Sequence, residues 1–511
     1  MNGIYLFVIL LFSWIAAVYF LSPYIRKSKH FSLFGPAIML KFVKNRGVIE
    51  SISKKFPAKM FSRVSVIIVI LAGIVALISL AYSAYLASFI RPSQAPPVTE
   101  FLGIPGINPV IPIGYGIVAL VISVVIHELM HGVTAKRHGL KVDSVGVLFF
   151  IVPVGAFVEP DESEMMQADP VVRRRIFAAG PGINIIIGVL LAIIISTIMF
   201  SSAVPMHQGV YVQSSDTTVN PSIIPGNEII AIGNYTGNNV TNALINSNLP
   251  PGTNVSVSLF NGKTVEHVQA MAGIVIISTL PGYPAANVSV PSNSILLSIN
   301  NTEIRNETVL ADVLDAIPPG NTISMKVLVM PSHTVKTYNM TTTSAYRYYA
   351  QYDPSANNPA YKGYSFIGIS ISYMGITGYQ MGEIRDLIFM RGFYSNPVEG
   401  FIEAIGLPFY GFNPVPSAMA DLFSVPFSPL IFWGMVNTFY WFFWINILLG
   451  ITNALPFAFF DGGQFFKDTL IILGRRFKAL SSEKVVNQVM YLMSFLVLFL
   501  IMWELIIPRI I

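Results

Sequence analysis

The chain has 511 residues, of which 53% are hydrophobic and only 11% are charged. Soluble globular proteins average about 25% charged residues, so this composition excludes an ordinary soluble protein and favours a polytopic membrane protein with a soluble insert. The lack of cysteine excludes a disulfide framework, a thiol nucleophile and any cysteine-ligated metal, and the net charge of +5 fits a basic membrane face better than nucleic-acid binding.

Several apolar stretches are long enough to cross a membrane as helices, which takes about 20 mostly apolar residues. We expect about six transmembrane helices, at residues 4–22, 64–90, 111–132, 176–200, 430–452 and 485–507. The first has no basic residues before it and no small-residue cleavage site after it, which favours a signal anchor over a cleaved signal peptide. The apolar stretch 144–158 is too short to cross and is interrupted by Pro153 and Gly155, so we expect a re-entrant or buried pair of strands.

The distribution of lysine and arginine predicts on which side of the membrane each connection lies. The connections 23–64, 133–175 and 456–484 hold ten, six and five basic residues, whereas 91–110 holds one and 204–346 holds four. These two kinds of connection alternate, so we expect both termini and the large insert to lie outside the cytosol, in a protein of the cell membrane. Seven Asn-x-Ser/Thr sequons, all in the insert, agree with that side if they are glycosylated, although an Asn- and Thr-rich domain can carry sequons by composition alone.

Between the fourth and fifth spans the pattern changes to short alternating apolar runs separated by Pro, Gly and Asn, which is typical of small β-rich domains. Residues 226–234 (GNEIIAIGN) resemble residues 292–300 (SNSILLSIN), and each segment is followed by a Pro-Gly turn and a further strand. This order is similar to a PDZ domain, so we expect two diverged PDZ-like copies, over 204–270 and 271–346. PDZ-type folds bind an extended peptide at a sheet edge, and a purely structural β domain is the alternative.

The segment His127-Glu128-Leu129-Met130-His131 lies within the third predicted span. Residues i and i+4 lie one above the other on a helix, so both imidazoles can reach one metal ion. Glu128 lies about 100° around the helix and can reach a water molecule beside the metal. Ionisable residues inside a bilayer are usually functional, and this span has no lysine or arginine to pair with them, so we expect a shared cation. In the alternative, these side chains only face a water-filled cavity.

A catalytic zinc ion usually has three protein ligands and one water, so the histidine pair lacks one ligand. The best candidate is Asp461, in the segment 453–463 (NALPFAFFDGG) at the inner end of the fifth span. The glycines beside it allow close backbone approach, and Pro456 would end a helix there. Glu159 and Asp161 lie in a soluble connection and fit less well.

These motifs carry a resemblance to a known family. The motif at 127–131 on a membrane helix, the segment Gly180-Pro-Gly-Ile-Asn184 opening the next helix, and the run at 453–463 resemble the site-2 protease family of intramembrane zinc metalloproteases. The resemblance covers residues 111–200 and 430–475, and an extracytosolic PDZ-like insert is similar to part of that family.

The resemblance implies a set of site residues: the Zn²⁺ ligands His127, His131 and Asp461, the catalytic base Glu128, and the substrate contacts Asn184 and Asn453. The sequence departs from the family at Phe460, where the family usually has Leu, and we expect little consequence. The implied activity is endoproteolysis within transmembrane segments of membrane-tethered proteins, known as regulated intramembrane proteolysis. The implied partners are a membrane-protein substrate with a transmembrane helix, a peptide or substrate ectodomain at the PDZ-like domains, and the lipid bilayer, with no nucleic acid.

A substrate helix hides its carbonyl groups in i→i+4 hydrogen bonds, so it must unwind before it is cleaved. The strand pair over 144–158 could supply an edge for the unwound segment. The expected domain order is an N-terminal two-span region with a basic cytosolic loop (1–110), the first half of the catalytic core (111–203), PDZ-like domains 1 (204–270) and 2 (271–346), a connecting or interfacial segment (347–429), and the second half of the core with the last span (430–511).

Two other functions stay open at this point. A proteolytically silent membrane scaffold could bind peptides through its PDZ-like domains and use zinc only structurally, but a structural site has no need of the base Glu128. A transporter or metal carrier could use the histidine pair, but it would need polar residues in several spans, and these are sparse in the first, second and sixth.

Overall fold

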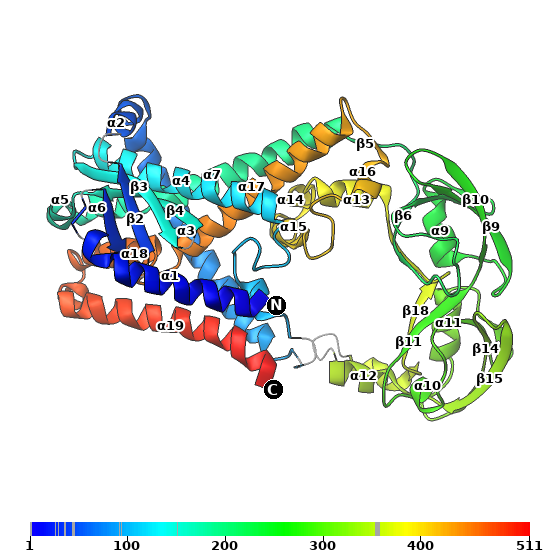
Figure 1. Cartoon of the computed structure of the whole chain (residues 1–511). Coiled ribbons are helices and arrows are strands. Elements are labelled where there is room, and N and C mark those ends of the chain that lie inside the picture. The colour runs from blue at the N-terminus through cyan, green and yellow to red at the C-terminus, as the bar shows by residue number, and fades with distance from the viewer. Residues whose placement is uncertain are drawn as a thin grey trace. The chain divides into compact units, whose positions relative to one another are not determined.

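The computed structural model describes residues 3–510 except for short gaps at 26, 29, 35–36, 43–45, 91, 93–94, 151 and 353–357. The chain forms two compact units (Figure 1). The first unit consists of residues 1–195 and 435–511, and the second consists of residues 196–434. The second unit contains the segments 204–270, 271–346 and 347–429 that the sequence separates from the predicted core.

Five helical stretches among the described residues are long and apolar enough to cross a membrane. They are Ala58–Ala87 (α3), Ile113–Arg137 (α4), Pro170–Ser202, Pro429–Ala454 (α17) and Glu483–Ile510 (α19). The third stretch runs through α6 (Pro170–Phe177), α7 (Ala179–Ile194), a π-helical turn (Ile195–Met199) and α8 (Phe200–Ser202). A shorter apolar stretch, Phe12–Ile25, lies in α1 (Gly3–Ile25). The last five predicted spans fall on the five long helices, and the first falls on α1.

A four-stranded antiparallel sheet belongs to the first unit. Its order is β1 (Phe31–Phe34), β2 (Ala37–Phe42), β3 (Val142–Phe150) and β4 (Val152–Pro160). The strand pair predicted over 144–158 is therefore confirmed, and two strands from the basic connection extend it. The register shifts between Leu148 and Phe149, opposite Gly155 and Pro153, because proline and glycine favour a bulge there. The edge strand β4 packs against α4.

The second unit contains two six-stranded sheets of the same topology. The first repeat consists of β6 (Val210–Ser215), β7 (Glu228–Ile232), β8 (Tyr235–Thr236), α9 (Asn239–Asn246), β9 (Asn254–Phe260) and β10 (Val265–Met271). The second repeat consists of β11 (Ile274–Thr279), α10 (Pro284–Asn287), β12 (Ser294–Ile299), β13 (Thr302–Glu303), α11 (Glu307–Asp315), β14 (Thr322–Val329) and β15 (Thr334–Thr341). The two similar sequence segments form β7 and β12, which occupy equivalent positions in the two sheets.

Each sheet takes its last strand from one hairpin outside both repeats. The strand β18 (Ile369–Tyr373) pairs with β11, and β19 (Ile376–Gln380) pairs with β6. Between them, Met374 and Gly375 adopt positive φ angles of 55° and 70°, as a tight turn requires. The predicted boundaries 204–270 and 271–346 therefore omit one strand of each sheet. Apolar side chains of both repeats and of this hairpin share one core, which includes Ile229, Ile276 and Met374.

The remaining elements are short. In the first unit they are α2 (Arg46–Lys55), the 3₁₀ turn Val98–Phe101, α5 (Glu162–Gln167), α18 (Asp461–Gly474) and the 3₁₀ turn Lys478–Leu480. In the second unit they are β5 (Val204–Pro205), β16 (Thr343–Ser344), α12 (Ala345–Tyr352), the 3₁₀ turn Pro359–Gly363, β17 (Ser365–Phe366), α13 (Met381–Ile388), α14 (Gly392–Ser395), α15 (Pro397–Gly406), α16 (Ser417–Ala420) and β20 (Phe423–Ser424).

Candidate metal centre

The helix α4 carries the first three site residues near its C-terminal end. It follows the extended residue Pro112, and it ends where Gly139 takes a φ of +94°, a conformation that glycine adopts without strain. One turn separates His127 from His131, so both imidazoles lie on one face. Both are buried, with 5% and 8% of their surface exposed. This face points toward the N-terminal end of α18.

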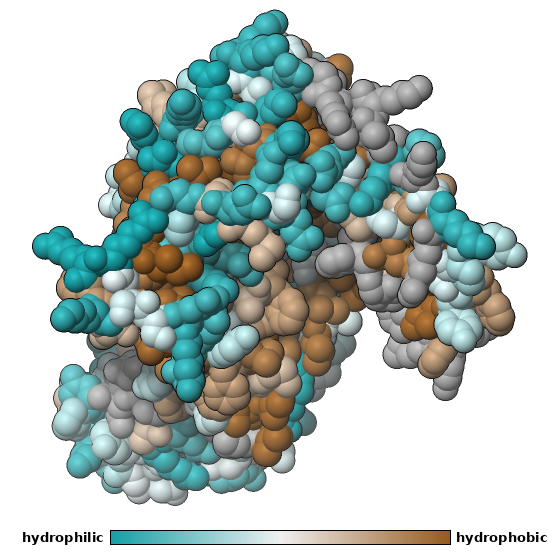
Figure 2. Space-filling model, turned by 90° about the vertical axis from the view of Figure 1, so that its left-hand side faces the viewer, coloured by the Kyte–Doolittle hydropathy of each residue, from teal (hydrophilic) through white to brown (hydrophobic). Residues whose placement is uncertain are grey.

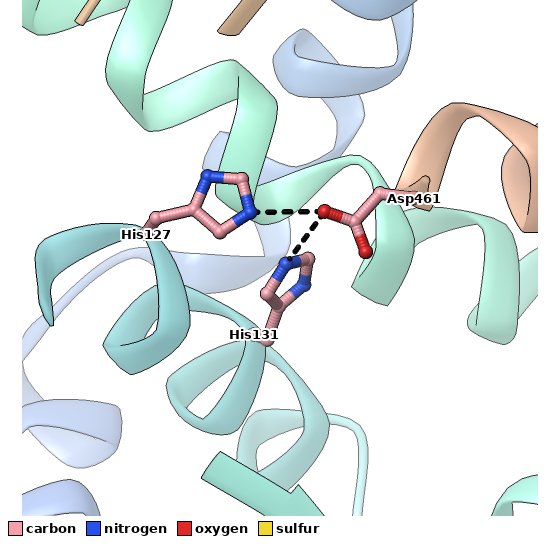
Figure 3. Close-up of side chains that lie close together, drawn as sticks. All are labelled: His127, His131 and Asp461. Carbon is pink, nitrogen blue, oxygen red and sulfur yellow. Dashed lines mark hydrogen bonds and ion pairs between the residues drawn. The ribbon is translucent and has the colours of Figure 1, made fainter. Parts of the chain in front are cut away.

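Asp461 is the first residue of α18. The helix α17 ends before Pro456, and the chain turns through Phe460, which is extended, into α18. One carboxylate oxygen, Oδ2, lies 2.9 Å from Nε2 of His127 and 3.1 Å from Nε2 of His131 (Figure 3). One ligand atom from each of these residues lies within 4.8 Å of the others. The structure thus brings the predicted histidine pair together with Asp461, which lies more than 300 residues later in the sequence.

The imidazole of His131 is oriented by the backbone of α6. Its Nδ1 donates a hydrogen bond of 2.7 Å to the carbonyl oxygen of Ile176. A carbonyl can only accept, so Nδ1 carries the proton and Nε2 presents its lone pair on the side of Asp461. Histidines that ligate metals are commonly held in this way by their other ring nitrogen.

The helix α7 leaves space beside the two imidazoles because residue 180 is a glycine. A Cβ atom built at Gly180 would lie 2.3 Å from Nε2 of His131 and 2.6 Å from Nε2 of His127. Any larger residue would therefore fill the side of the site on which both ring nitrogens converge. Two imidazoles and one carboxylate form a donor set that suits zinc. The residues present fit a bound zinc ion.

Glu128 faces the same site without belonging to the three ligands. Together with His131, Asp461 and the end of β4, it lines a cavity of about 380 Å³. Its Oε2 accepts a hydrogen bond of 3.3 Å from the backbone N–H of Val158 in β4. The carboxylate of Glu128 therefore lies in the same cavity as two of the candidate ligands, next to the end of β4.

A sequence model of peptidase family M50 matches residues 115–497, which are 383 of the 511 residues. The chain belongs to peptidase family M50, the site-2 protease family. Members of this family are zinc metalloproteases, which fits the donor set of two imidazoles and one carboxylate. The M50 match begins near the start of α4 and ends in α19, so it includes every candidate ligand.

This M50 peptidase is also similar to "Uncharacterized protein MJ0971" of Methanocaldococcus jannaschii. The two are 36% identical over 144 residues, which are 27% of this chain and 38% of the relative. The chain therefore aligns with well under half of the length of that relative. The five long apolar helices of the M50 peptidase fit a membrane protein.

The two asparagines predicted to contact substrate lie apart from the cavity wall. Asn184 lies one turn after Gly180 in α7, and its buried amide has no hydrogen-bond partner among the described residues. Asn453 lies in the last turn of α17, where its Nδ2 donates to the carbonyl oxygen of Leu449 (3.0 Å). No hydrogen bond in the described part of the chain joins either amide to a candidate ligand, so their contact with substrate stays a prediction.

Glu159 is a residue of the cavity wall whose place the sequence pattern does not reveal. It lies at the end of β4, where its carboxylate accepts hydrogen bonds from Nζ of Lys41 (2.7 Å) and from Oγ of Ser144 (2.5 Å). Burial alone would raise the pKa of Glu159, but the bonds from Lys41 and Ser144 outweigh burial and hold the pKa below its usual range. Lys41 lies 118 residues away in sequence, so only the sheet β2-β3-β4 brings the pair together.

Proposed function

We propose that this M50 peptidase is a membrane-embedded zinc endopeptidase that cleaves transmembrane segments of membrane-tethered proteins, as in regulated intramembrane proteolysis. The observation that carries the proposal is the convergence of His127, His131 and Asp461 beside a cavity that Glu128 also lines. The two histidines and the glutamate come from an apolar helix long enough to cross a membrane. A hydrolytic site on such a helix suits a substrate that lies in the same membrane.

The exposed surfaces of the long helices support membrane insertion. In α3, Ile67, Ile74 and Ile78 expose 60%, 51% and 64% of their surface, and a soluble monomer rarely exposes a long apolar face of this kind. We propose that these helices span the membrane, so that the protein is an integral multi-pass protein of the cell membrane.

The polar end of the first unit supports a cytosolic position for the site. Figure 2 looks onto the side on which α2, α5 and α18 lie, and hydrophilic side chains cover much of it. The last turns of α2 and α4 carry the basic residues Lys54, Lys55, Lys136 and Arg137. Basic residues favour the cytosolic side, and His131 lies close to the basic end of α4. We therefore place the cleavage site near the cytosolic face and the two repeats outside the cytosol.

Each of the site residues would have its own role in hydrolysis. His127, His131 and Asp461 would hold the zinc ion, which supplies Lewis-acid activation of water and of the scissile carbonyl when it is bound. Glu128 would accept a proton from the attacking water and deliver it to the leaving amine. The carbonyl group of Ile176 would keep His131 in the tautomer that can ligate.

The edge strand β4 offers a place for the unwound substrate. The N–H of Val158 points toward Glu128 and away from β3, so Val158 and Val145 form a pair without mutual hydrogen bonds. Because such pairs alternate along an antiparallel ladder, the backbone of residue 156 also faces away from β3. A substrate segment that pairs with this edge would run past the base and the metal.

Replacing the outward amide tests this role of β4. We expect Ala156→Pro to lower the rate of cleavage and to keep bound zinc, because proline removes the N–H that a substrate strand would use. The control Ala156→Gly retains that N–H and should cleave at nearly the wild-type rate. Equal rates for the proline and glycine variants would exclude strand addition at this edge.

We further propose that the two repeats are PDZ-like domains that bind an extended peptide or the ectodomain of a substrate. Their sheets end at β10 and β19 in one case and at β15 and β18 in the other. An extended peptide can add a strand only at such an edge. Binding of substrate ectodomain peptides to the purified protein, measured by titration calorimetry, tests this part of the proposal.

The proposed function as a whole is tested with purified protein and transmembrane substrates. We expect Glu128→Gln to retain zinc and to lose turnover by about 10²–10⁴-fold, because general-base catalysis contributes that much. His131→Ala should lose both zinc and turnover. Cleavage by Glu128→Gln at the wild-type rate would contradict the proposal.

A further inference from the structure

We infer that Arg173 and Asp468 are positioning residues, which hold Asp461 at the right distance from the histidine pair and thereby set the affinity of the site for zinc. This inference rests on the proposed zinc site and deepens it. It starts from the short helix α6, which touches both halves of the site.

The helix α6 contacts the histidine pair through the backbone of Ile176. Ile176 is only 1% exposed, and its carbonyl oxygen accepts the hydrogen bond from Nδ1 of His131. The helix α6 also packs against α4. The position of α6 therefore determines where the imidazole of His131 points.

The helix α6 also forms a fork-shaped ion pair with α18. Nε of Arg173 lies 3.1 Å and 3.2 Å from the two carboxylate oxygens of Asp468, and Nη2 lies 2.5 Å from Oδ1. The other terminal nitrogen, Nη1, donates to the carbonyl oxygens of Met166 (3.2 Å) and Ala168 (3.4 Å). The side chain of Asp468 is 4% exposed. A planar fork on a buried carboxylate fixes direction as well as distance, which a single contact does not.

Because α18 is one continuous helix, the ion pair at Asp468 also restricts the position of Asp461 at the start of that helix. Asp468 lies seven residues after Asp461, which is two helical turns or about 10 Å along the axis. Residues seven apart lie on nearly the same face of a helix. Arg173 and Ile176 lie one turn apart on α6, so one short helix holds both the ring of His131 and the face of α18 that begins with Asp461.

The same two segments are joined by a second ion pair that serves as a comparison. Nη2 of Arg475 lies 2.9 Å from a carboxylate oxygen of Asp169, the residue that caps α6. The side chains of Arg475 and Asp169 are 53% and 50% exposed, and exposed ion pairs contribute little to stability. Arg475 also follows the last residue of α18, far from Asp461. The exposed pair should therefore have little influence on the metal.

The experiment measures zinc affinity of the full-length protein in detergent by competition with a chromophoric chelator. We expect Asp468→Asn to bind zinc about 10–100-fold more weakly, the range typical when a group that orients a ligand is lost. Arg173→Lys keeps the charge but loses the fork, so it should show a smaller loss in the same direction. The matched control Arg475→Gln should bind zinc like the wild type.

Two further readouts separate positioning from a general structural role. The visible spectrum of the Co²⁺-substituted protein reports ligand geometry, and it should change in Asp468→Asn and Arg173→Lys but not in Arg475→Gln. The rise in melting temperature on adding zinc should also shrink in the first two variants, because that rise depends on zinc affinity. Arg173→Lys keeps these measurements possible if Asp468→Asn fails to fold.

The outcomes distinguish this inference from the proposed function. Wild-type protein that binds zinc, together with variants that bind it equally well, would overturn the positioning role and leave the zinc site standing. An equal loss of melting temperature with and without zinc would also overturn it, because a merely structural pair acts in that way. Wild-type protein that binds no zinc would overturn the proposed function itself.

Discussion

The two compact units of this chain use their buried groups differently. In the first unit, buried ionisable side chains meet partly buried ones on elements that are distant in sequence, as His131 meets Asp461 and Asp468 meets Arg173. In the second unit, two repeats share an apolar core that includes Ile229 and Ile276. Substitutions in the first unit should therefore change metal binding and catalysis, whereas substitutions in the second should change stability.

The largest expected effect is the loss of the third ligand. Asp461→Asn removes the charged oxygen that lies between the two imidazoles, so we expect bound zinc and turnover to fall to background. Zinc is measured by inductively coupled plasma mass spectrometry and turnover with a transmembrane substrate. Glu303→Gln, at an exposed position of the second unit, is the control and should retain both. A metal-loaded, active Asp461→Asn enzyme would remove the distinction between the units.

The next effect tests the space beside the imidazoles. Gly180→Ala places a methyl group where both Nε2 atoms converge, so we expect a nearly complete loss of zinc while the protein stays folded. Alanine is a better helix former than glycine, so α7 itself should not be weakened. The control is Gly114→Ala in α4, where a Cβ atom would meet nothing within 4 Å. Wild-type zinc affinity in Gly180→Ala would show that the metal does not occupy this space.

A substitution that creates a cavity in the second unit should have the opposite result, a loss of stability with no loss of zinc. Ile229 is 0% exposed, so Ile229→Ala should destabilise the repeats by about 2–5 kcal/mol and leave zinc affinity unchanged. Thermal unfolding followed by circular dichroism gives the first quantity, and chelator competition gives the second. Ile277→Ala, at a residue that is 39% exposed, should cost about 0.5 kcal/mol or less. A parallel loss of zinc in Ile229→Ala would mean that the units are not independent.

A further effect, which appears only as a pH dependence of stability, concerns a buried carboxylate in the second unit. Burial raises the pKa of Glu228 to about 7, although a hydrogen bond from the N–H of Gly209 opposes the rise. The only described basic side chain paired with it is His207, whose Nδ1 lies 3.9 Å from Oε2. The folded state binds this proton more tightly than the unfolded chain does, so stability should be highest at low pH and fall as the pH rises from about 4.5 through about 7.

The variant Glu228→Gln should lose most of this pH dependence, which amounts to roughly 3 kcal/mol at one pKa unit per 1.4 kcal/mol. Unfolding is measured between these pH values in the wild type and in the variant. Glu266→Gln, at an exposed position of β10, should retain the wild-type slope. An unchanged slope in Glu228→Gln would assign the pH dependence to other groups.

Local sequence patterns predict those helices, strands and repeats that are determined by neighbouring residues. The run of apolar residues in α4 and the spacing of His127 and His131 predict a helix with two imidazoles on one face, and the strands β3 and β4 follow from the short apolar stretch at 144–158. The similarity of the segments that form β7 and β12 predicts the repeat. Each of these features depends on residues that are close together in the chain.

Features that depend on distant pairing could not be predicted in the same way. Lys41 and Glu159 are brought together by strand order, and the ion pair of Arg173 and Asp468 depends on how α6 packs against α18. The hairpin of β18 and β19 pairs with strands that lie about 90–100 residues earlier (β11) and about 160–170 residues earlier (β6), so local alternation does not identify its partners. Asp461 is the exception among distant contacts, because a zinc site with two histidines requires a third ligand.

X-ray absorption at the zinc edge tests the central claim most directly, because it reports the atoms bound to the metal. The purified Glu128→Gln protein keeps substrate intact and is the best sample. We expect about one zinc ion per chain, with two imidazole nitrogens and carboxylate or water oxygens at about 2.0–2.2 Å, and loss of this spectrum in Asp461→Asn. A zinc ion with no imidazole or with three or more, or an unchanged spectrum in Asp461→Asn, would contradict the account.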